Sequence, residues 1–339
     1  MSKIKKRNLI LVFSLIILGL LAVFSSQTAG GAIDGLTICA TLIVPSLFPL
    51  TVMALFIFNS GAYTALVNVV GLDFTVWLLS AIGGYPCGAI LLERLYKMGG
   101  IDKKRGEKML CFCVNAGPSF IVYTIGKTLL HNTFFGVLLL IIHLLPSFVF
   151  MLVSALSQKE NCQKFGNLLP ISDAFVLSVK GGLEGALSLT ASVTFVFAVT
   201  GMLKTVLPIA VISKTLGFFE ITYGIKSNPQ NLYLTSFLLG FSGISVIFQI
   251  LSAQSYLKPS FYTVLAARLL HGVASFLLSV VAFSIFKPDI STLQGGIKAA
   301  QYPLSTTLTI IICAILFLVC LNPNNSNFAR RSKNVKINL

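Results

Sequence analysis

Apolar segments of membrane-spanning length recur along the whole chain. They lie near residues 9–26, 36–59, 74–92, 109–130, 133–156, 185–207, 231–256, 261–286 and 304–321. A transmembrane helix needs about 20 predominantly apolar residues. Charged residues make up only 10% of the sequence, whereas a soluble domain contains about 25%. The sequence therefore predicts an all-α polytopic membrane protein that contacts the lipid bilayer along most of its length.

The basic residues, which give a formal net charge of +15, are clustered rather than dispersed. They gather at both termini and in the segment 94–108. This clustering is typical of cytoplasmic loops of membrane proteins, and no soluble basic domain is evident that would bind nucleic acid. We interpret 9–26 as an uncleaved first span with a cytoplasmic N-terminus; the alternative is a cleaved signal peptide.

Residue patterns typical of enzymes and pumps are lacking. The seven cysteines and three histidines do not have the spacing of a zinc site, so we expect no metal or resident cofactor. No Ser-His pair, Asp pair or zinc-protease set stands at a workable helical spacing. A phosphate-binding loop for an ATP-driven pump is also missing from the sequence. The chain is therefore not expected to be an enzyme.

Four segments of the first half resemble four segments of the second half, in the same order. The pairs are 30–44 with 181–195, 71–75 with 218–222, 78–84 with 238–244, and 113–120 with 269–276. This alignment places Asp73 opposite Glu220 and Asn115 opposite His271. The match predicts an internal duplication.

Basic residues indicate how the two repeats are oriented. The segment 94–108 carries six of them, whereas its counterpart, roughly 250–261, carries only Lys258. Because positive loops stay cytoplasmic, equivalent loops are expected on opposite sides, which predicts an inverted repeat. The predicted organisation is an N-terminal transmembrane helix (1–29), a first repeat (30–156), a cytoplasmic connector (157–180), a second repeat (181–321) and a basic tail (322–339).

Four apolar segments contain helix-breaking or small polar residues in their middle. These are GGYP (83–86), NAGPS (115–119), GFSGIS (240–245) and HGVAS (271–275). Proline removes a backbone donor and glycine tolerates the resulting turn. Unpaired backbone groups are costly in lipid, so such breaks should lie inside protein or line a hydrated cavity. We expect re-entrant hairpins at 74–92 and 231–256 and broken transmembrane helices at 109–130 and 261–286; the alternative for any single break is a kink.

The residues at these breaks are the predicted contacts of a solute. They are Gly84, Tyr85, Pro86, Cys87, Asn115, Gly117, Pro118, Ser119, Ser242, Gly243, Ser245, Gln249, His271 and Ser275. Half-helix N-termini facing a cavity favour an anionic ligand. Arg268 either adds a cationic contact or snorkels to the membrane interface. Glu220 is either an ion-coupling carboxylate, for Na⁺ or H⁺, or an interfacial helix cap.

One long segment of the first half resembles a known family. Residues 83–122 (GGYPCGAILLERLYKMGGIDKKRGEKMLCFCVNAGPSFIV), with GFFEITYGI and LGFSGISVIFQILS in the second half, are similar to the Gate, or nucleoside-recognition, domain of the YlbJ (SpoVV) family of sporulation integral membrane proteins. The resemblance covers most of residues 30–286. It implies a fold similar to the core of concentrative nucleoside transporters. It also implies a sporulation role in spore-forming Firmicutes, movement of dipicolinic acid towards the forespore, and a location in the bacterial inner membrane or the outer forespore membrane.

The residues and the resemblance together favour a secondary transporter of a small polar, anionic solute. Dipicolinate is the first solute expected and a nucleoside-like aromatic the second. The rival hypothesis is a sporulation membrane assembly or scaffold protein that keeps the fold without transport. The sequence leaves open the direction of transport and the formation of a homo-oligomer.

Overall fold

Helices account for all regular structure in the part of the chain that the computed structural model describes, residues 3–156, 169–208 and 216–286. In the first half they are α1 (Lys3–Val23), α2 (Ser25–Ile38), η1 (Cys39–Ile43), α3 (Val44–Asn59), α4 (Tyr63–Val70), α5 (Leu72–Gly83), α6 (Cys87–Lys97), α7 (Lys103–Met109), η2 (Ser119–Leu129) and α8 (Thr133–Leu156). In the second half they are α9 (Ile171–Leu203), α11 (Ile221–Ser227), α12 (Leu232–Phe241), α13 (Gly243–Ala253) and α14 (Phe261–Phe286). The predicted all-α fold is confirmed, and the expected span 304–321 and the tail 322–339 lie outside the described residues.

Five helical stretches are long and apolar enough to cross a membrane. They are Ser25–Asn59, Thr133–Leu156, Ile171–Leu203, Leu232–Ala253 and Phe261–Phe286. Large apolar side chains on their surfaces are exposed, for example Val153, Phe195 and Val281. Exposed apolar side chains along long helices are the pattern expected where lipid replaces water. The protein is therefore a multi-pass membrane protein.

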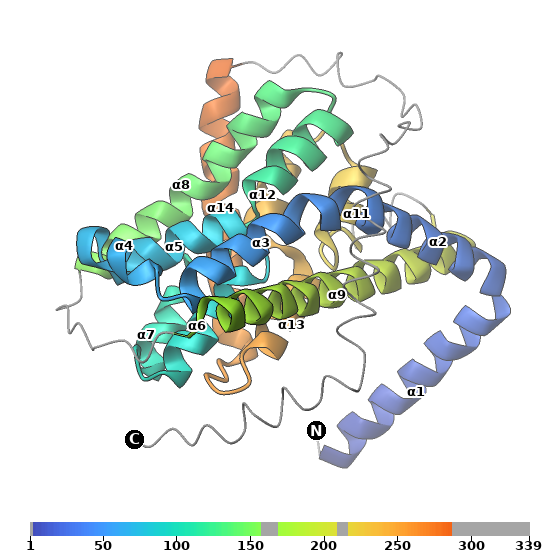
Figure 1. Cartoon of the computed structure of the whole chain (residues 1–339). Coiled ribbons are helices and arrows are strands. Elements are labelled where there is room, and N and C mark those ends of the chain that lie inside the picture. Colours follow the sequence, from blue (N-terminus) through green and yellow to red (C-terminus); the bar gives the residue numbers. More distant parts are fainter. Residues whose placement is uncertain (1–2, 157–168, 209–215, 287–339) are drawn as a thin grey trace. The chain divides into compact units, whose positions relative to one another are not determined.

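Two long helical stretches form a side-by-side pair. The helices α2 and α3, joined by the π-helical turn η1, run along α9 (Figure 1). The helix α9 begins at Ile171, so the second half of the predicted connector is already part of this helix. The boundary expected near residue 29 also falls inside a helix, α2.

The predicted first hairpin, around residues 74–92, is present. The helices α5 and α6 pack against each other and are joined by the turn Gly84–Pro86. Gly84 has a φ of 70°, a value that side chains rarely permit. The turn therefore occurs where Gly84 ends α5 with a positive φ and Pro86 precedes the first residue of α6.

The second break differs from the predicted hairpin. The chain does break between α12 and α13, where Ser242 and Gly243 have φ values of 67° and 78°. However, α12 packs mainly against α14, whereas α13 reaches α6, α9 and α14, and the two arms make few contacts with each other. The break is thus an open joint rather than a closed hairpin, and the inverted repeat stays a prediction.

Of the two predicted broken helices, one is broken and one is continuous. The chain is irregular over residues 110–118 and becomes helical again in η2. In contrast, α14 runs without interruption from Phe261 to Phe286, so the break expected at HGVAS is wrong. HGVAS contains no proline, and its Gly272 instead allows a close approach, because a Cβ there would lie 3.1 Å from the Phe237 carbonyl oxygen of α12.

Candidate functional site

The tip of the first hairpin contacts both halves of the chain. The Thr51 hydroxyl in α3 donates to the Gly83 carbonyl oxygen at 2.6 Å. The Tyr85 hydroxyl donates to the Leu239 carbonyl oxygen in α12 at 2.8 Å. A Cβ at Gly84 would lie 3.0 Å from the Gly117 nitrogen, so the tip also packs on the irregular segment 110–118. Three breaks therefore lie close together in space.

The joint between α12 and α13 is hydrogen bonded to the chain just before α11. The Ile244 amide donates to the Phe218 carbonyl oxygen at 3.0 Å and the Ser245 amide to that of Phe219 at 2.9 Å. These bonds place the start of α13 beside Glu220. They also occupy two amides that we expected to be free for a ligand at this break.

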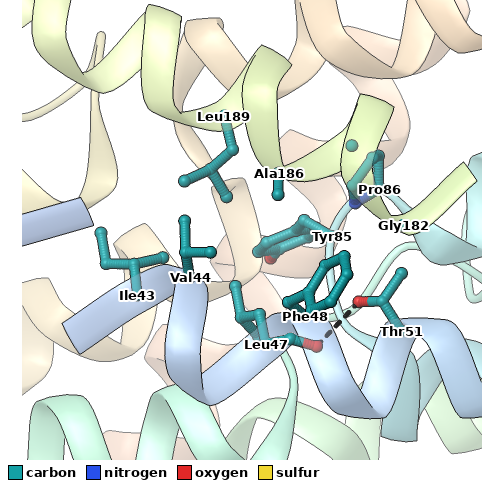
Figure 2. Close-up of a pocket in the computed structure, with 11 residues that line it drawn as sticks. Ile43, Val44, Leu47, Phe48, Thr51, Tyr85, Pro86, Gly182, Ala186 and Leu189 are labelled. Atoms are coloured by element: carbon teal, nitrogen blue, oxygen red, sulfur yellow. Dashed lines mark hydrogen bonds between the residues drawn. The ribbon is translucent and has the colours of Figure 1, made fainter. Parts of the chain in front are cut away.

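Two small cavities adjoin the hairpin tip and share four lining residues, Ile43, Leu47, Tyr85 and Leu189. Figure 2 shows the first, in which the Tyr85 ring lies between α3 and α9. Its other lining residues are Val44, Phe48, Thr51, Pro86, Gly182, Gly185 and Ala186. The second cavity adds Phe120, Val193, Glu220, Ile221, Thr222, Val246 and Gln249. Their empty volumes are about 270 and 320 Å³, partly open to the surroundings, and each has room for about one water molecule.

The second cavity is the more polar and brings together elements from both halves. Tyr85 comes from the first hairpin, Glu220 and Thr222 from the start of α11, and Gln249 from α13. Gln249 is 4% exposed, and its side-chain oxygen has no hydrogen-bond partner. A buried amide oxygen without a partner is costly, and such groups indicate a place for water or a ligand. Thr222 and Phe120 were not predicted; Thr222 lies two residues after Glu220 in a segment that the internal alignment had singled out.

Glu220 is both a helix cap and a cavity residue. Its side chain is 2% exposed, and one carboxylate oxygen accepts the Tyr223 amide at 2.7 Å, which confirms the expected cap. It is not at an interface, as the cap interpretation had assumed, but inside the protein. The aligned residue Asp73 is equally buried but is paired with Arg105 at 2.7 Å. The two carboxylates therefore differ in their partners rather than in their burial.

Arg268 is fully buried and does not snorkel. Its guanidinium donates to the Val114 carbonyl oxygen and, at 3.3 Å, to that of Cys111. It also lies 3.2 Å from Nδ1 of His271. The arginine thus pairs the carbonyl groups that the irregular segment 110–118 leaves without helical partners. It is not among the residues that line either cavity.

Two stacked histidines complete this polar network. The rings of His143 and His271 are 4.7 Å apart, and Nε2 of His271 donates to the His143 carbonyl oxygen at 2.8 Å. Nε2 of His143 accepts the Ala116 amide at 2.9 Å, and the Asn115 amide nitrogen donates to the Phe112 carbonyl oxygen at 2.8 Å. This hydrogen-bond network therefore holds the irregular segment 110–118 in place and does not line either cavity. His143 was not predicted, although an imidazole in an apolar span is a usable signal.

The remaining predicted residues pack around the breaks. Cys87, Gly117, Ser242, Gly243 and Ser275 are buried, whereas Pro118, Ser119 and Ser245 are half-buried. The Ser242 hydroxyl donates to its neighbouring Phe241 carbonyl oxygen at 2.6 Å. Of the predicted contacts, only Tyr85, Pro86, Gln249 and the coupling candidate Glu220 line the cavities.

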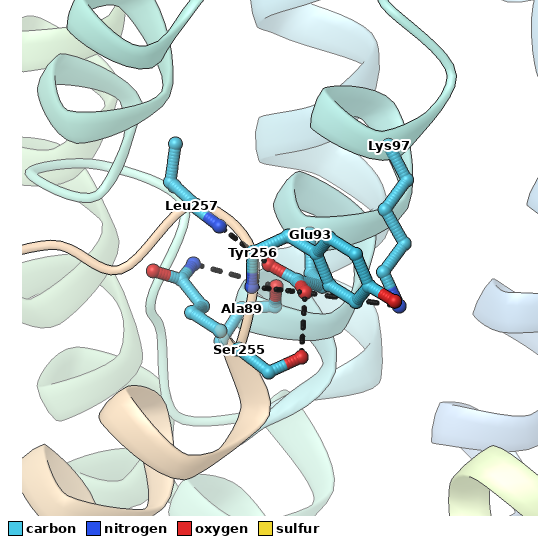
Figure 3. Close-up of polar contacts among 7 residues, drawn as sticks. Ala89, Glu93, Lys97, Ser255, Tyr256 and Leu257 are labelled. Atoms are coloured by element: carbon cyan, nitrogen blue, oxygen red, sulfur yellow. Dashed lines mark hydrogen bonds and ion pairs between the residues drawn. The ribbon is translucent and has the colours of Figure 1, made fainter.

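A carboxylate outside the cavities joins the two halves (Figure 3). Glu93 in α6 accepts the amides of Tyr256 at 2.8 Å and Leu257 at 3.2 Å, and the Ser255 hydroxyl at 3.1 Å. The Lys97 ammonium lies 3.8 Å from Glu93 and 3.9 Å from the Tyr256 ring centre. We call Glu93 and residues 255–257 the Glu93 clamp. It attaches the second arm of the hairpin to the turn that follows α13.

Comparison with known proteins yields one relative. The chain is similar to the sporulation integral membrane protein YlbJ of Bacillus subtilis (strain 168), with 24% identity over 317 residues, covering 75% of this chain and 76% of that protein. No family model matches the chain. No solved structure matches it either. The similarity supports the YlbJ-type resemblance as a distant relationship, and it agrees with a multi-pass membrane location.

Proposed function

We propose that the protein is a secondary transporter that carries a small polar solute through the second cavity. The observation that supports this most is the convergence of both halves on one small, mainly apolar cavity that contains Glu220 and Gln249 and lies beside three helix breaks. Discontinuous helices that meet at a shared site are typical of secondary transporters. The distant similarity to a sporulation membrane protein suggests that the transport serves sporulation.

Transport through this cavity requires a change of conformation. Each cavity has room for about one water molecule, so the structure corresponds to a closed state. The hairpin tip at Tyr85 and Pro86 and the open joint at Ser242 are the segments whose displacement would enlarge the cavity. If these two segments moved one after the other, the cavity would open first to one side of the membrane and then to the other.

The lining indicates which solutes to test. Tyr85 and Phe120 offer aromatic surface, while Thr222 and Gln249 offer hydrogen-bonding groups. This combination suits a planar polar molecule, with dipicolinate as the first probe and a nucleoside such as uridine as the second. No basic residue lines either cavity. An anionic solute would therefore need a positive charge from another source, such as a co-transported cation or proton. An uncharged nucleoside would need none.

The experiment is solute exchange in proteoliposomes that contain the full chain, with a matched pair of glutamine variants. Both glutamines are buried and have a side-chain oxygen without a partner, but Gln249 lines the cavity, whereas Gln254 lies outside it and donates to the Ala89 carbonyl oxygen. We expect Gln249→Ala to slow exchange by about tenfold or more and Gln254→Ala to change it little. Equal effects of the two variants would contradict the assignment of the site. A folded wild-type protein that exchanges neither probe would favour the assembly or scaffold hypothesis.

A further inference from the structure

Glu220, which lines the second cavity, is the one carboxylate among the residues that line the two cavities. Among their lining residues only Tyr85 and Glu220 have ionisable side chains. The described residues contain three carboxylate ion pairs, which involve Glu93, Glu107 and Asp73 but not Glu220. An unpaired acidic group in a nearly dry cavity is therefore the main electrostatic feature of the site.

The groups around Glu220 do not supply a compensating positive charge. Tyr223 and Thr222 contribute hydrogen bonds from the start of α11. Cys39 in η1 lies close enough to interact with the Glu220 charge, and Tyr85 lines the same cavity. Lys226, six residues after Glu220, lies over the Phe197 ring at 5.7 Å. Two main-chain amides stabilise the carboxylate in part, but a buried charge without a cation still favours protonation.

An anionic solute in this cavity would make the ionised carboxylate still less favourable. Two negative charges that share a small, poorly hydrated cavity repel each other strongly. Uptake of one proton removes the repulsion, so proton binding and anion binding each strengthen the other. Side-chain oxygens of Tyr85, Glu220, Thr222 and Gln249 line the same cavity, so the test also includes a sodium gradient as the alternative driving force.

We propose that Glu220 couples solute movement to a proton, in a symport of one proton with an anionic solute. Its carboxyl takes up the proton from one side as the solute enters the cavity and releases it to the other side as the solute leaves. The inference rests on the proposed function and names the coupling ion and the residue that carries it. The Gln249 amide, which lines the same cavity with an unpartnered oxygen, is available to orient the solute beside the neutral carboxyl.

The test compares accumulation with exchange, using dipicolinate in proteoliposomes whose membrane potential is clamped with potassium and valinomycin. An inward gradient of about one pH unit should let the wild-type protein accumulate the probe about tenfold. Glu220→Gln should lose this accumulation, while exchange of internal for external dipicolinate continues, because exchange does not require release of the proton. Retained exchange also shows that the variant is folded.

Asp73→Asn is the matched control, because Asp73 is equally buried but is paired with Arg105 away from the cavities. Its ratio of accumulation to exchange should stay that of the wild type. A proton-driven accumulation that persists in Glu220→Gln would overturn the inference, as would accumulation driven by a sodium gradient instead. Absence of both exchange and accumulation in the wild-type protein is a different result, which would refute the proposed function itself.

Discussion

The Glu93 carboxylate in α6 accepts the main-chain amide of Tyr256 at 2.8 Å, across 163 positions of sequence. With Ser255 and Leu257 it forms the Glu93 clamp, which links the hairpin to the turn after α13. Hydrogen bonds to a buried charged group are among the stronger ones in proteins. The clamp therefore fixes the distance between the second arm of the hairpin, whose tip holds Tyr85, and the turn that follows α13, whose Gln249 lines the second cavity.

Replacement of Glu93 should destabilise the protein. The change Glu93→Ala leaves the amides of Tyr256 and Leu257 without their acceptor, and we expect the free energy of unfolding to fall by about 2–3 kcal/mol. Thermal unfolding in detergent measures the effect. Glu107→Ala is the control, because Glu107 is partly exposed and its contact to Lys103 spans 4.0 Å. A similar loss of unfolding free energy in both variants would show that the Glu93 clamp does not stabilise the protein more than a surface ion pair does.

Arg268 should act on folding more than on solute affinity. Arg268→Met removes the donors for the carbonyl groups of Cys111 and Val114, and we expect a loss of about 3 kcal/mol in unfolding free energy. Lys127→Met, at an exposed position, should have little effect. Unfolding curves test the difference. Normal stability together with abolished exchange would mean that Arg268 contacts the solute instead.

The close contact between α12 and α14 depends on two facing glycines. A Cβ at Gly240 would lie 2.7 Å from the Gly272 Cα atom. We therefore expect Gly240→Ala to destabilise the protein by about 1–3 kcal/mol, because the helices would have to separate. Gly30 has no neighbouring atom within 4 Å of the corresponding position, so Gly30→Ala should be neutral or stabilising. Equal melting temperatures for the two variants would contradict the packing.

The hairpin tip should open more often without the Tyr85 hydroxyl. Tyr85→Phe removes the bond to the Leu239 carbonyl oxygen, which is worth about 1 kcal/mol. Cys87 lies directly behind the tip and is fully buried. In a protein with Cys87 as the single cysteine, Tyr85→Phe should make the labelling of Cys87 by a water-soluble maleimide about fivefold faster. An unchanged rate would mean that this bond does not hold the tip closed.

The sequence predicted both breaks that contain proline and one of the two that lack it, because the chain breaks at GFSGIS but not at HGVAS. Pro86 and Pro118 stand at the starts of α6 and η2, where proline is tolerated because the backbone N–H has no helical partner there. Proline alone does not mark a break, since Pro49 and Pro146 lie inside α3 and α8. Gly272 remains helical, since a lone glycine in a helix can serve close packing instead. The sequence did not predict that α12 and α13 stay apart. Their arrangement depends on the other helices that each one packs against, and a local sequence pattern carries no information on those tertiary contacts.

The same contrast holds for the candidate site. Gln249 and Glu220 were identified because polar residues are costly inside apolar segments, and both line the second cavity. Arg268 was also recognised as unusual, but besides His271 it pairs with main-chain carbonyl groups, which no sequence pattern reveals. The Glu93 clamp escaped notice for the same reason, because the groups that it binds are main-chain amides.

The most direct test of the central claim is labelling of a cysteine placed at Gln249 in a protein without other cysteines. If the second cavity is the transport site, a water-soluble thiol reagent should reach this cysteine from both sides of the membrane, and a bound solute should protect it. A cysteine that reacts from neither side, or one whose reaction dipicolinate and uridine leave unchanged, would contradict the account.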